Sequence, residues 1–203
     1  MINDFIHKFV AGRLPVTLLL LHGTGGDEND LLPVARAIAP GAALLSPRGK
    51  VIGQGMVRFF GLDWKDVPER AAELAKWTGE AAAHYAFDPA RVIALGYSNG
   101  ANLAANLMLL HPGVLSGACL LRSRTILIPE HRTNLNGAPV LISAGQSDHI
   151  IPLEDAEALG KLLTDAGARV DLAIQNAGHE LTPADFSLAK QWFSRLLVDR
   201  PAA

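Results

Sequence analysis

Residues 91–111 read RVIALGYSNGANLAANLMLLH, and this stretch decides the fold. Residues 92–96 are apolar, as in a buried strand, and apolar residues recur at helical spacing in the second half. At the junction, Ser98 stands between Gly96 and Gly100. In the pattern G-x-S-x-G, the serine occupies a tight turn from strand to helix, which exposes its hydroxyl above the sheet. We therefore expect Ser98 to be a nucleophile; the alternative is a serine turn without chemistry.

Short apolar runs alternate with helical patterns along the rest of the chain. The apolar runs, mostly apolar on both faces, predict strands at 16–22, 42–46, 91–96, 117–121, 139–145 and 169–175. The helical patterns predict helices at 28–39, 67–86, 99–111, 153–167 and 183–199. This alternation predicts a single three-layer α/β/α domain over residues 1–203, with a mostly parallel central sheet. In such folds, ligands bind beyond the carboxyl ends of the strands.

The composition is that of an ordinary globular protein. With 203 residues, 49% hydrophobic and 19% charged, and a net charge of −2, the chain gives no electrostatic reason to expect nucleic acid as a partner. Cys119 is the only cysteine, so neither an internal disulfide nor a cysteine-based zinc site is expected. The beginning of the chain lacks the features of a signal peptide, and the longest apolar run, at 16–21, is too short to span a bilayer. We expect a cytoplasmic protein with no stable membrane association.

A serine hydroxyl needs a base to remove its proton, and that base needs an acid to orient it. Asp148 follows the predicted strand at 139–145, and His179 follows the strand at 169–175. Both therefore lie just past the carboxyl end of a strand, where they would reach Ser98. The alternatives are a turn or helix-capping role for Asp148 and a loop or cap position for His179.

The oxyanion formed during attack on an ester needs backbone N–H donors. One donor is expected from Asn99, directly after the nucleophile, and the other from Thr24 in the glycine-rich loop after the first strand. That loop raises a second hypothesis, the cradle of a dinucleotide pyrophosphate. However, Glu28 stands where the third glycine of G-x-G-x-x-G belongs, and no acid follows about 20 residues later. The sequence therefore disfavours nucleotide binding.

Five motifs together resemble the phospholipase/carboxylesterase branch of the α/β-hydrolases: LHGTGGDENDL (21–31), SPRGKVIGQGMVRFF (46–60), GYSNGANLA (96–104), GQSDHIIP (145–152) and AGHEL (177–181). The chain is similar to acyl-protein thioesterases and, more closely, to small bacterial carboxylesterases of the hydroquinone-resistance type, from about residue 18 to residue 193. The resemblance implies an α/β-hydrolase fold, no metal and no organic cofactor. It also implies that Ser98, Asp148 and His179 form a catalytic triad and that Thr24 and Asn99 donate hydrogen bonds to the oxyanion.

The substrate is less well defined than the chemistry. Residues 122–138 alone separate two predicted strands, so no large cap domain is expected and the cleft should be shallow. Met56, Phe59 and Phe60 either form an apolar wall of an acyl pocket or pack their loop onto the core. Arg48 either anchors the same loop or meets an acidic substrate group.

The segment 122–137 departs from the usual pattern of such relatives, because it carries Arg122, Arg124 and Arg132 beside the expected substrate site. We expect a serine carboxylesterase that cleaves small, short-chain esters through an acyl-enzyme on Ser98. The alternatives are an acyl-protein thioesterase or lysophospholipase-like activity, and a non-catalytic ligand-binding protein. Assembly into a homodimer stays open.

Overall fold

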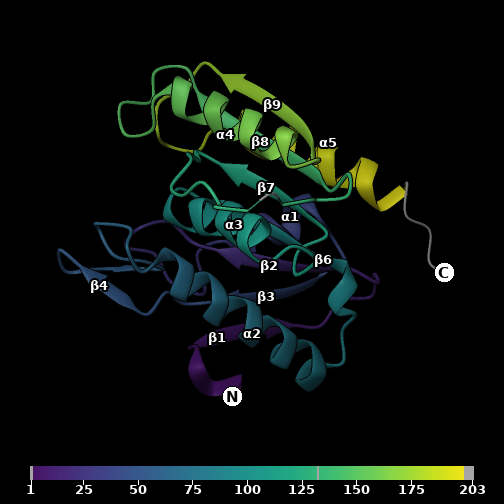
Figure 1. Ribbon diagram of the computed structural model, residues 1–203. Coiled ribbons are helices and arrows are strands. Elements are labelled where there is room, and N and C mark those ends of the chain that lie inside the picture. Colours follow the sequence, from purple (N-terminus) through teal and green to yellow (C-terminus); the bar gives the residue numbers. More distant parts are fainter. Residues whose placement is uncertain (1, 132, 199–203) are drawn as a thin grey trace.

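In the computed structural model, which describes residues 2–131 and 133–198, a seven-stranded β-sheet runs through the middle of the molecule (Figure 1). Its first strand is antiparallel to its neighbour, and the other strands are parallel to one another. In their order across the sheet, the strands are β1 (His7–Val10), β3 (Ala43–Pro47), β2 (Thr17–Leu21), β6 (Val92–Tyr97), β7 (Gly117–Leu121), β8 (Pro139–Gly145) and β9 (Arg169–Gln175).

Helices cover both faces of this sheet. One face packs against α2 (Val67–Tyr85), α3 (Asn99–Leu110) and α4 (Leu153–Asp165). The other face packs against α1 (Leu32–Ile38) and α5 (Pro183–Val198). The predicted α/β/α layering, with a mostly parallel sheet and no large cap, is therefore confirmed.

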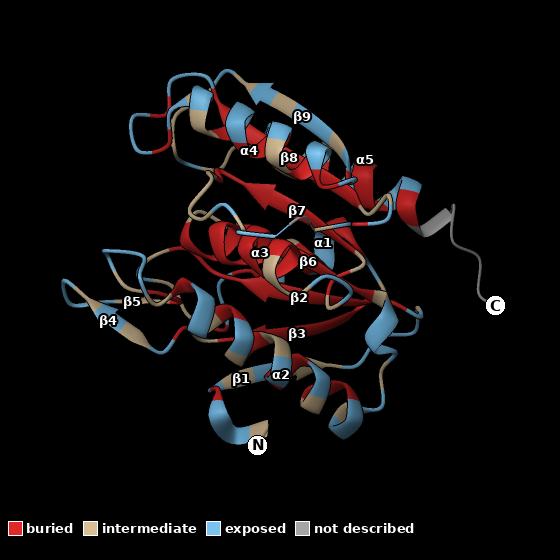
Figure 2. Ribbon diagram, in the orientation of Figure 1, coloured by how far each residue is buried: buried red, intermediate tan, exposed pale blue. Residues whose placement is uncertain are grey.

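The central strands bury apolar side chains on both faces, as predicted for a parallel sheet. In β2, Leu19 and Leu21 pack under α2 and α3, whereas Leu18 and Leu20 pack under α1 and α5, because successive side chains of a strand point to opposite faces. Helix α3 is buried along almost its whole length (Figure 2). It therefore holds a fixed position against the sheet.

Three strands lie outside the predicted set. Strand β1 pairs with β3 at the edge of the sheet, and its residues are half-buried or exposed, so no long apolar run marks it. Within the segment 46–66, β4 (Val51–Gly53) and β5 (Met56–Arg58) form a hairpin that projects beyond the sheet (Figure 1). Each is too short for alternation in the sequence to indicate a strand.

The largest difference from the predicted helix boundaries is at the start of the first helix, and the other helices end within two residues of prediction where the structure describes them. Helix α1 begins at Leu32 instead of residue 28, with Pro33 in its first turn, a position that proline favours. The last residue of the helix predicted at 183–199 lies outside the described residues. Short 3₁₀ turns at Ile2–Asp4 and Pro89–Arg91 lead into β1 and β6.

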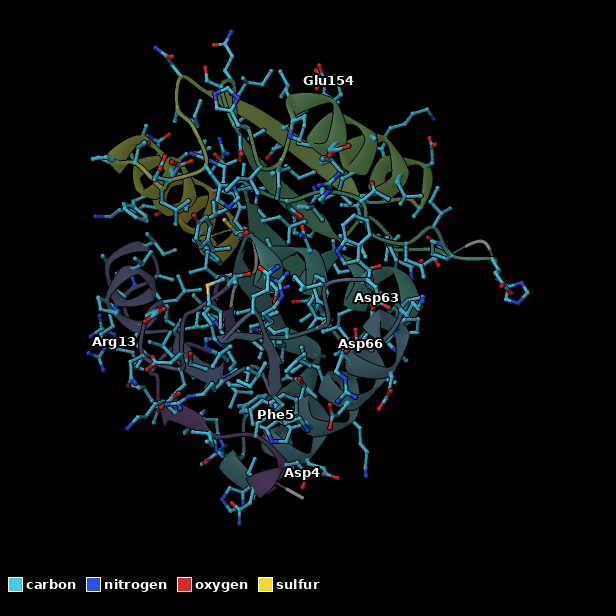
Figure 3. All side chains as sticks on the ribbon, turned by 90° about the vertical axis from the view of Figure 1, so that its left-hand side faces the viewer. Asp4, Phe5, Arg13, Asp63, Asp66 and Glu154 are labelled. Carbon is cyan, nitrogen blue, oxygen red and sulfur yellow. The ribbon has the colours of Figure 1, made fainter. Side chains whose placement is uncertain are left out.

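The strand order reverses between β2 and β6. From β2 the chain continues to β3 on one side, and from β6 it continues through β7 and β8 to β9 on the other side. Consequently, β2 leads into α1 on one face of the sheet and β6 leads into α3 on the other. In open α/β sheets, ligands bind at the position where the strand order reverses in this way. Figure 3 looks onto this edge of the sheet, where Glu154 marks the start of α4 and Asp66 the start of α2.

Helix α3 approaches the end of β2 closely because residue 100 is glycine. A Cβ at Gly100 would lie 2.2 Å from the carbonyl oxygen of Leu21 and 2.5 Å from that of His22. Both are backbone atoms, so they cannot move aside without shifting β2. This contact sets the position of the N-terminus of α3 at the carboxyl edge of the sheet.

We predict that Gly100→Ala lowers the free energy of unfolding by about 1–3 kcal/mol, because the added methyl group overpacks two backbone carbonyls. For a chain of this size, each kcal/mol lowers the melting temperature by about 2–4 °C. The matched control is Gly79→Ala in α2, where an added Cβ meets nothing within 4 Å. That substitution should leave the melting temperature unchanged or raise it. Equal melting temperatures for the two variants would show that the close contact is not a constraint.

Candidate active site

Ser98 lies in the turn between β6 and α3, with φ 50° and ψ −114°. A positive φ is unusual for a residue with a side chain and costs on the order of 1–3 kcal/mol, so the surroundings must hold it. The Ser98 N–H donates to the carbonyl of Leu121 in the next strand, and its carbonyl accepts from the N–H of Asn102 in α3, both at 2.9 Å. At Gly96, a Cβ would lie 2.7 Å from the backbone nitrogen of Ala101, so the turn can close only over glycine.

The three residues predicted as a triad lie within hydrogen-bond distance of one another. His179 Nε2 lies 3.0 Å from Ser98 Oγ, and His179 Nδ1 lies 2.8 Å from Asp148 Oδ2. An ionised carboxylate only accepts hydrogen bonds, so the histidine proton belongs on Nδ1, and the Nε2 lone pair faces the serine hydroxyl. The arrangement can withdraw the proton of Ser98 as that oxygen attacks an electrophile.

Asp148 is held by its own loop as well as by His179. Its Oδ1 accepts from the N–H of Ile150 at 2.8 Å and from the N–H of Ile151 at 2.9 Å. Burial alone would raise the pKa of Asp148, but hydrogen bonds from Ile151, His179 and Ile150 outweigh it and hold the pKa below its ordinary value. Asp148 is therefore ionised at neutral pH, as an orienting acid must be.

The loop after β2 passes beside the N-terminus of α3. In this loop, Gly25 donates its N–H to the carbonyl of Val57 in β5, at 2.8 Å. Among the described residues, no hydrogen bond engages the backbone N–H of Thr24 or of Asn99. Asn99 is the first residue of a twelve-residue helix, whose dipole favours negative charge there. Both predicted oxyanion donors thus have an N–H available for a ligand.

His22 joins the loop after β2 to the segment that contains the hairpin. Its Nε2 accepts from the N–H of Gly49 at 3.0 Å, so its proton lies on Nδ1, which donates to the carbonyl of Gly23 at 2.7 Å. Burial is the main cause that lowers the pKa of His22, so the ring stays neutral at pH 7. The predictions from sequence did not include this residue.

Arg48 anchors its loop. Its guanidinium binds both carboxylate oxygens of Glu28, with Nε–Oε2 at 2.5 Å and Nη2–Oε1 at 2.9 Å. The hydrogen bond from Arg48 is the largest cause of the lowered pKa of Glu28, which is buried. Of the two roles considered for Arg48, the structure shows the anchoring contact.

The three residues considered for an acyl pocket separate into two groups. Phe59 and Phe60 are only 2% and 1% exposed and belong to the core under α2 and α3, so they pack the loop onto the body of the protein. The N–H of Phe59 also donates to Asn99 Oδ1 at 2.7 Å, which ties this loop to the turn at Ser98. Met56, in contrast, is 42% exposed, and its Sδ lies 3.6 Å from where a Cβ of Gly25 would be. Of the three, Met56 is the side chain available to a ligand.

The arginines of the segment 122–137 also have different surroundings. Arg122 is fully buried and pairs with Asp185 at 2.8 Å. Arg124 pairs with Asp155 of α4 at 2.6 Å, and its guanidinium lies 5.3 Å from the centre of the Trp64 ring. Arg132 lies outside the described residues.

Within residues 2–131 and 133–198, no group of three or more His, Cys, Asp or Glu side chains is arranged to hold a metal ion. Cys119 lies in β7, and burial is the main cause that raises the pKa of its thiol. None of the helices described here combines the length and the apolar character that crossing a bilayer requires.

The chain is similar to known proteins over most of its length. Residues 63–197 match the family model described as Phospholipase/Carboxylesterase. The MhqD protein of Bacillus subtilis (strain 168) is 40% identical over 198 residues, which cover 95% of this chain and 99% of that protein.

Solved structures of carboxylesterases have the same fold. The Bacillus cereus carboxylesterase superposes with a TM-score of 0.89 at 40% identity, over 93% of this chain and 92% of that one. The carboxylesterase from Mesorhizobium loti superposes with a TM-score of 0.84 at 38% identity, over 90% of each chain. By its family match, its relatives and its fold, the chain belongs to the phospholipase/carboxylesterase family of α/β-hydrolases.

Proposed function

We propose that the protein is a serine carboxylesterase that hydrolyses small esters through an acyl-enzyme on Ser98. The observation that carries this proposal is the continuous hydrogen-bonded chain from Ser98 Oγ through His179 to Asp148. Membership of a hydrolase family supports the reaction class. The strained turn, which places Ser98 at the N-terminus of α3, supports its role as the attacking residue.

In the first half of the reaction, Ser98 Oγ attacks the carbonyl carbon of the ester while its proton passes to His179 Nε2. The tetrahedral intermediate carries a negative oxygen, and we propose that the N–H groups of Thr24 and Asn99, which have no acceptor within the described residues, bind it. The Asp148 carboxylate stabilises the imidazolium that forms. When the C–O bond to the alcohol breaks, His179 returns the proton to the departing alkoxide, and the acyl group remains on Ser98.

In the second half, water takes the place of the alcohol. His179 Nε2 removes a proton from the water as its oxygen attacks the acyl carbon. The second tetrahedral intermediate uses the same oxyanion donors. When its bond to Ser98 Oγ breaks, the carboxylic acid is released and His179 returns the proton to Ser98 Oγ, which restores the starting state.

The surroundings of Ser98 favour a short acyl group. The connection from β7 to β8 contains no inserted domain, so the acyl chain has only loops to lie against. Met56, which is 42% exposed and lies beside Gly25 of the loop after β2, offers apolar surface on the hairpin side. This surface is open to water, so its contribution should stop growing after a few methylene groups.

The assignment of the nucleophile predicts that Ser98→Ala reduces kcat/KM by at least about three orders of magnitude while the protein remains folded. A fluorophosphonate probe should label the wild-type protein on the peptide that contains Ser98, which mass spectrometry can identify. The matched control is Ser116→Ala, at the amino end of β7 on the opposite edge of the sheet, and it should keep both activity and labelling. Labelling of another serine, with Ser98 unmodified, would refute the assignment.

The open acyl surface predicts a preference for short chains. Each buried methylene contributes about 0.8 kcal/mol at most, and only while there is surface to bury it. We expect kcat/KM to be higher for p-nitrophenyl acetate and butyrate than for the laurate or palmitate. Met56→Ala should lower kcat/KM for butyrate more than for acetate, whereas Ile6→Ala, an exposed residue beside β1, should change neither. A steady gain out to palmitate would contradict the proposed site.

The triad also predicts how activity depends on pH. The pKa of Asp148 is held below its ordinary value of about 3.9, so this carboxylate stays ionised between about pH 5 and pH 9. His179 must be neutral to accept the proton of Ser98. In the acid part of the profile, kcat/KM should therefore rise with pH as a single group loses its proton. A profile of log kcat/KM against pH tests this, with an expected limiting slope of about one. A rate independent of pH over this range would exclude His179 as the base.

A further inference from the structure

The segment that carries His179 is held by side chains from two neighbouring strands. The carbonyls of Gly178 and Glu180 accept hydrogen bonds from the guanidinium of Arg122, at 2.8 and 3.0 Å. The carbonyl of His179 itself accepts from the hydroxyl of Tyr97, at 3.1 Å. Three consecutive carbonyls are thus bound. The segment lies between β9 and α5, where no sheet or helix hydrogen bonds fix its backbone.

The guanidinium of Arg122 has an acceptor for each of its five N–H groups. In addition to the carbonyls of Gly178 and Glu180, it donates to both carboxylate oxygens of Asp185, at 2.8 and 2.9 Å, and to the carbonyl of Ser143, at 3.2 Å. The side chain is fully buried. Arg122 therefore has no donor left for a substrate, although its place in the sequence is beside the site.

Asp185 connects this arginine to the helix that follows. Its carboxylate also accepts from the hydroxyl of Ser143 at 2.6 Å and from the N–H and hydroxyl of Thr182, at 2.8 and 2.9 Å. Burial would raise the pKa of Asp185, but the hydrogen bonds from Arg122, Ser143 and Thr182 outweigh it and lower the pKa. The pair is therefore ionic, and it joins the end of β7, the middle of β8 and the first turn of α5.

Stability alone does not account for such a pair. Replacing a buried ion pair by apolar residues of similar volume is often neutral or stabilising, because desolvation offsets the attraction between the charges. Arg122 also has a positive φ of 54°, a conformation that disfavours residues with side chains. What a planar guanidinium offers here is the ability to bind two carbonyls, on either side of His179, and a carboxylate at fixed angles.

We infer that Arg122, with Asp185, is a positioning residue for His179: it holds the backbone on both sides of the histidine, so that the ring meets Ser98 Oγ and Asp148 together. This inference rests on the proposed function. Arg122 touches neither the substrate nor the reacting atoms, and it acts only through the placement of the base. A displacement of about 1 Å at a catalytic group can lower a rate by about 10²-fold.

The test is the double substitution Arg122→Met with Asp185→Leu, which removes both charges and leaves neither buried alone. We expect a folded protein with a lower melting temperature, because the carbonyls of Gly178 and Glu180 and the N–H of Thr182 lose their partners. In the folded fraction, kcat should be about 10²-fold lower with little change in KM. The acid limb of the pH profile, which is the range where kcat/KM rises with pH, should also move to lower pH. The reason is that the imidazolium of His179 is less stabilised when it lies farther from Asp148. A purely structural defect reduces the amount of folded enzyme and does not move this limb.

Two further variants complete the experiment. Arg91→Met removes an arginine that pairs with Asp88 at the amino edge of the sheet, and it should leave kcat and the pH profile unchanged. Arg122→Lys keeps the charge but has three donors in place of five, so kcat should fall by about tenfold or more. If the double variant does not fold, Arg122→Lys decides the question.

The outcomes separate this inference from the proposed function. If the wild-type protein hydrolyses esters and is labelled on Ser98, but the double variant or Arg122→Lys keeps the wild-type kcat and acid limb, the positioning role is overturned. If the wild-type protein is not labelled on Ser98 at all, the proposed function fails first. A lower kcat with an acid limb shifted to lower pH in the folded double variant, and with Arg91→Met unchanged, supports both.

Discussion

The contact between the N-terminus of α3 and the end of β2 is the constraint on which the site depends. Because Gly100 lets the helix approach the carbonyls of Leu21 and His22, the turn at Ser98 lies at the carboxyl edge, beside the loop after β2. The strained conformation of Ser98 is then held by the neighbouring strand and by α3. Ser98, the N-terminus of α3 and the loop that carries Thr24 are thereby brought together largely by backbone packing.

The fold and the grouping of Ser98, Asp148 and His179 could be predicted from the sequence because each has a strong local signal. Buried parallel strands are continuous apolar runs in the sequence. The glycines on both sides of Ser98 are typical of a tight turn from strand to helix that exposes a serine hydroxyl. Asp148 and His179 could be located because chain order and strand ends restrict the choice. Strand β1 and the hairpin were missed, since short, half-exposed strands depend on their partners and not on a pattern of their own.

The surroundings of the triad could not be predicted, because they are contacts between distant segments. Arg122 lies 63 residues from Asp185, and nothing in the local sequence distinguishes it from Arg124, which pairs on the surface of α4. Phe59 and Phe60 could line a pocket or the core equally well by sequence, and their burial depends on where the loop lies. The segment of His179 is consequently held by a buried polar network, whereas the turn at Ser98 is held by glycine and helix packing.

From this geometry we expect Ser98 to be the residue that carries the acyl group. The most direct measurement is to quench the enzyme with acid during turnover of p-nitrophenyl butyrate and to locate any butyryl group by peptide mass spectrometry. We expect a butyryl ester on Ser98, which disappears when the substrate is exhausted. Turnover with no acylated Ser98 at any quench time, or with the butyryl group on another residue, would contradict it.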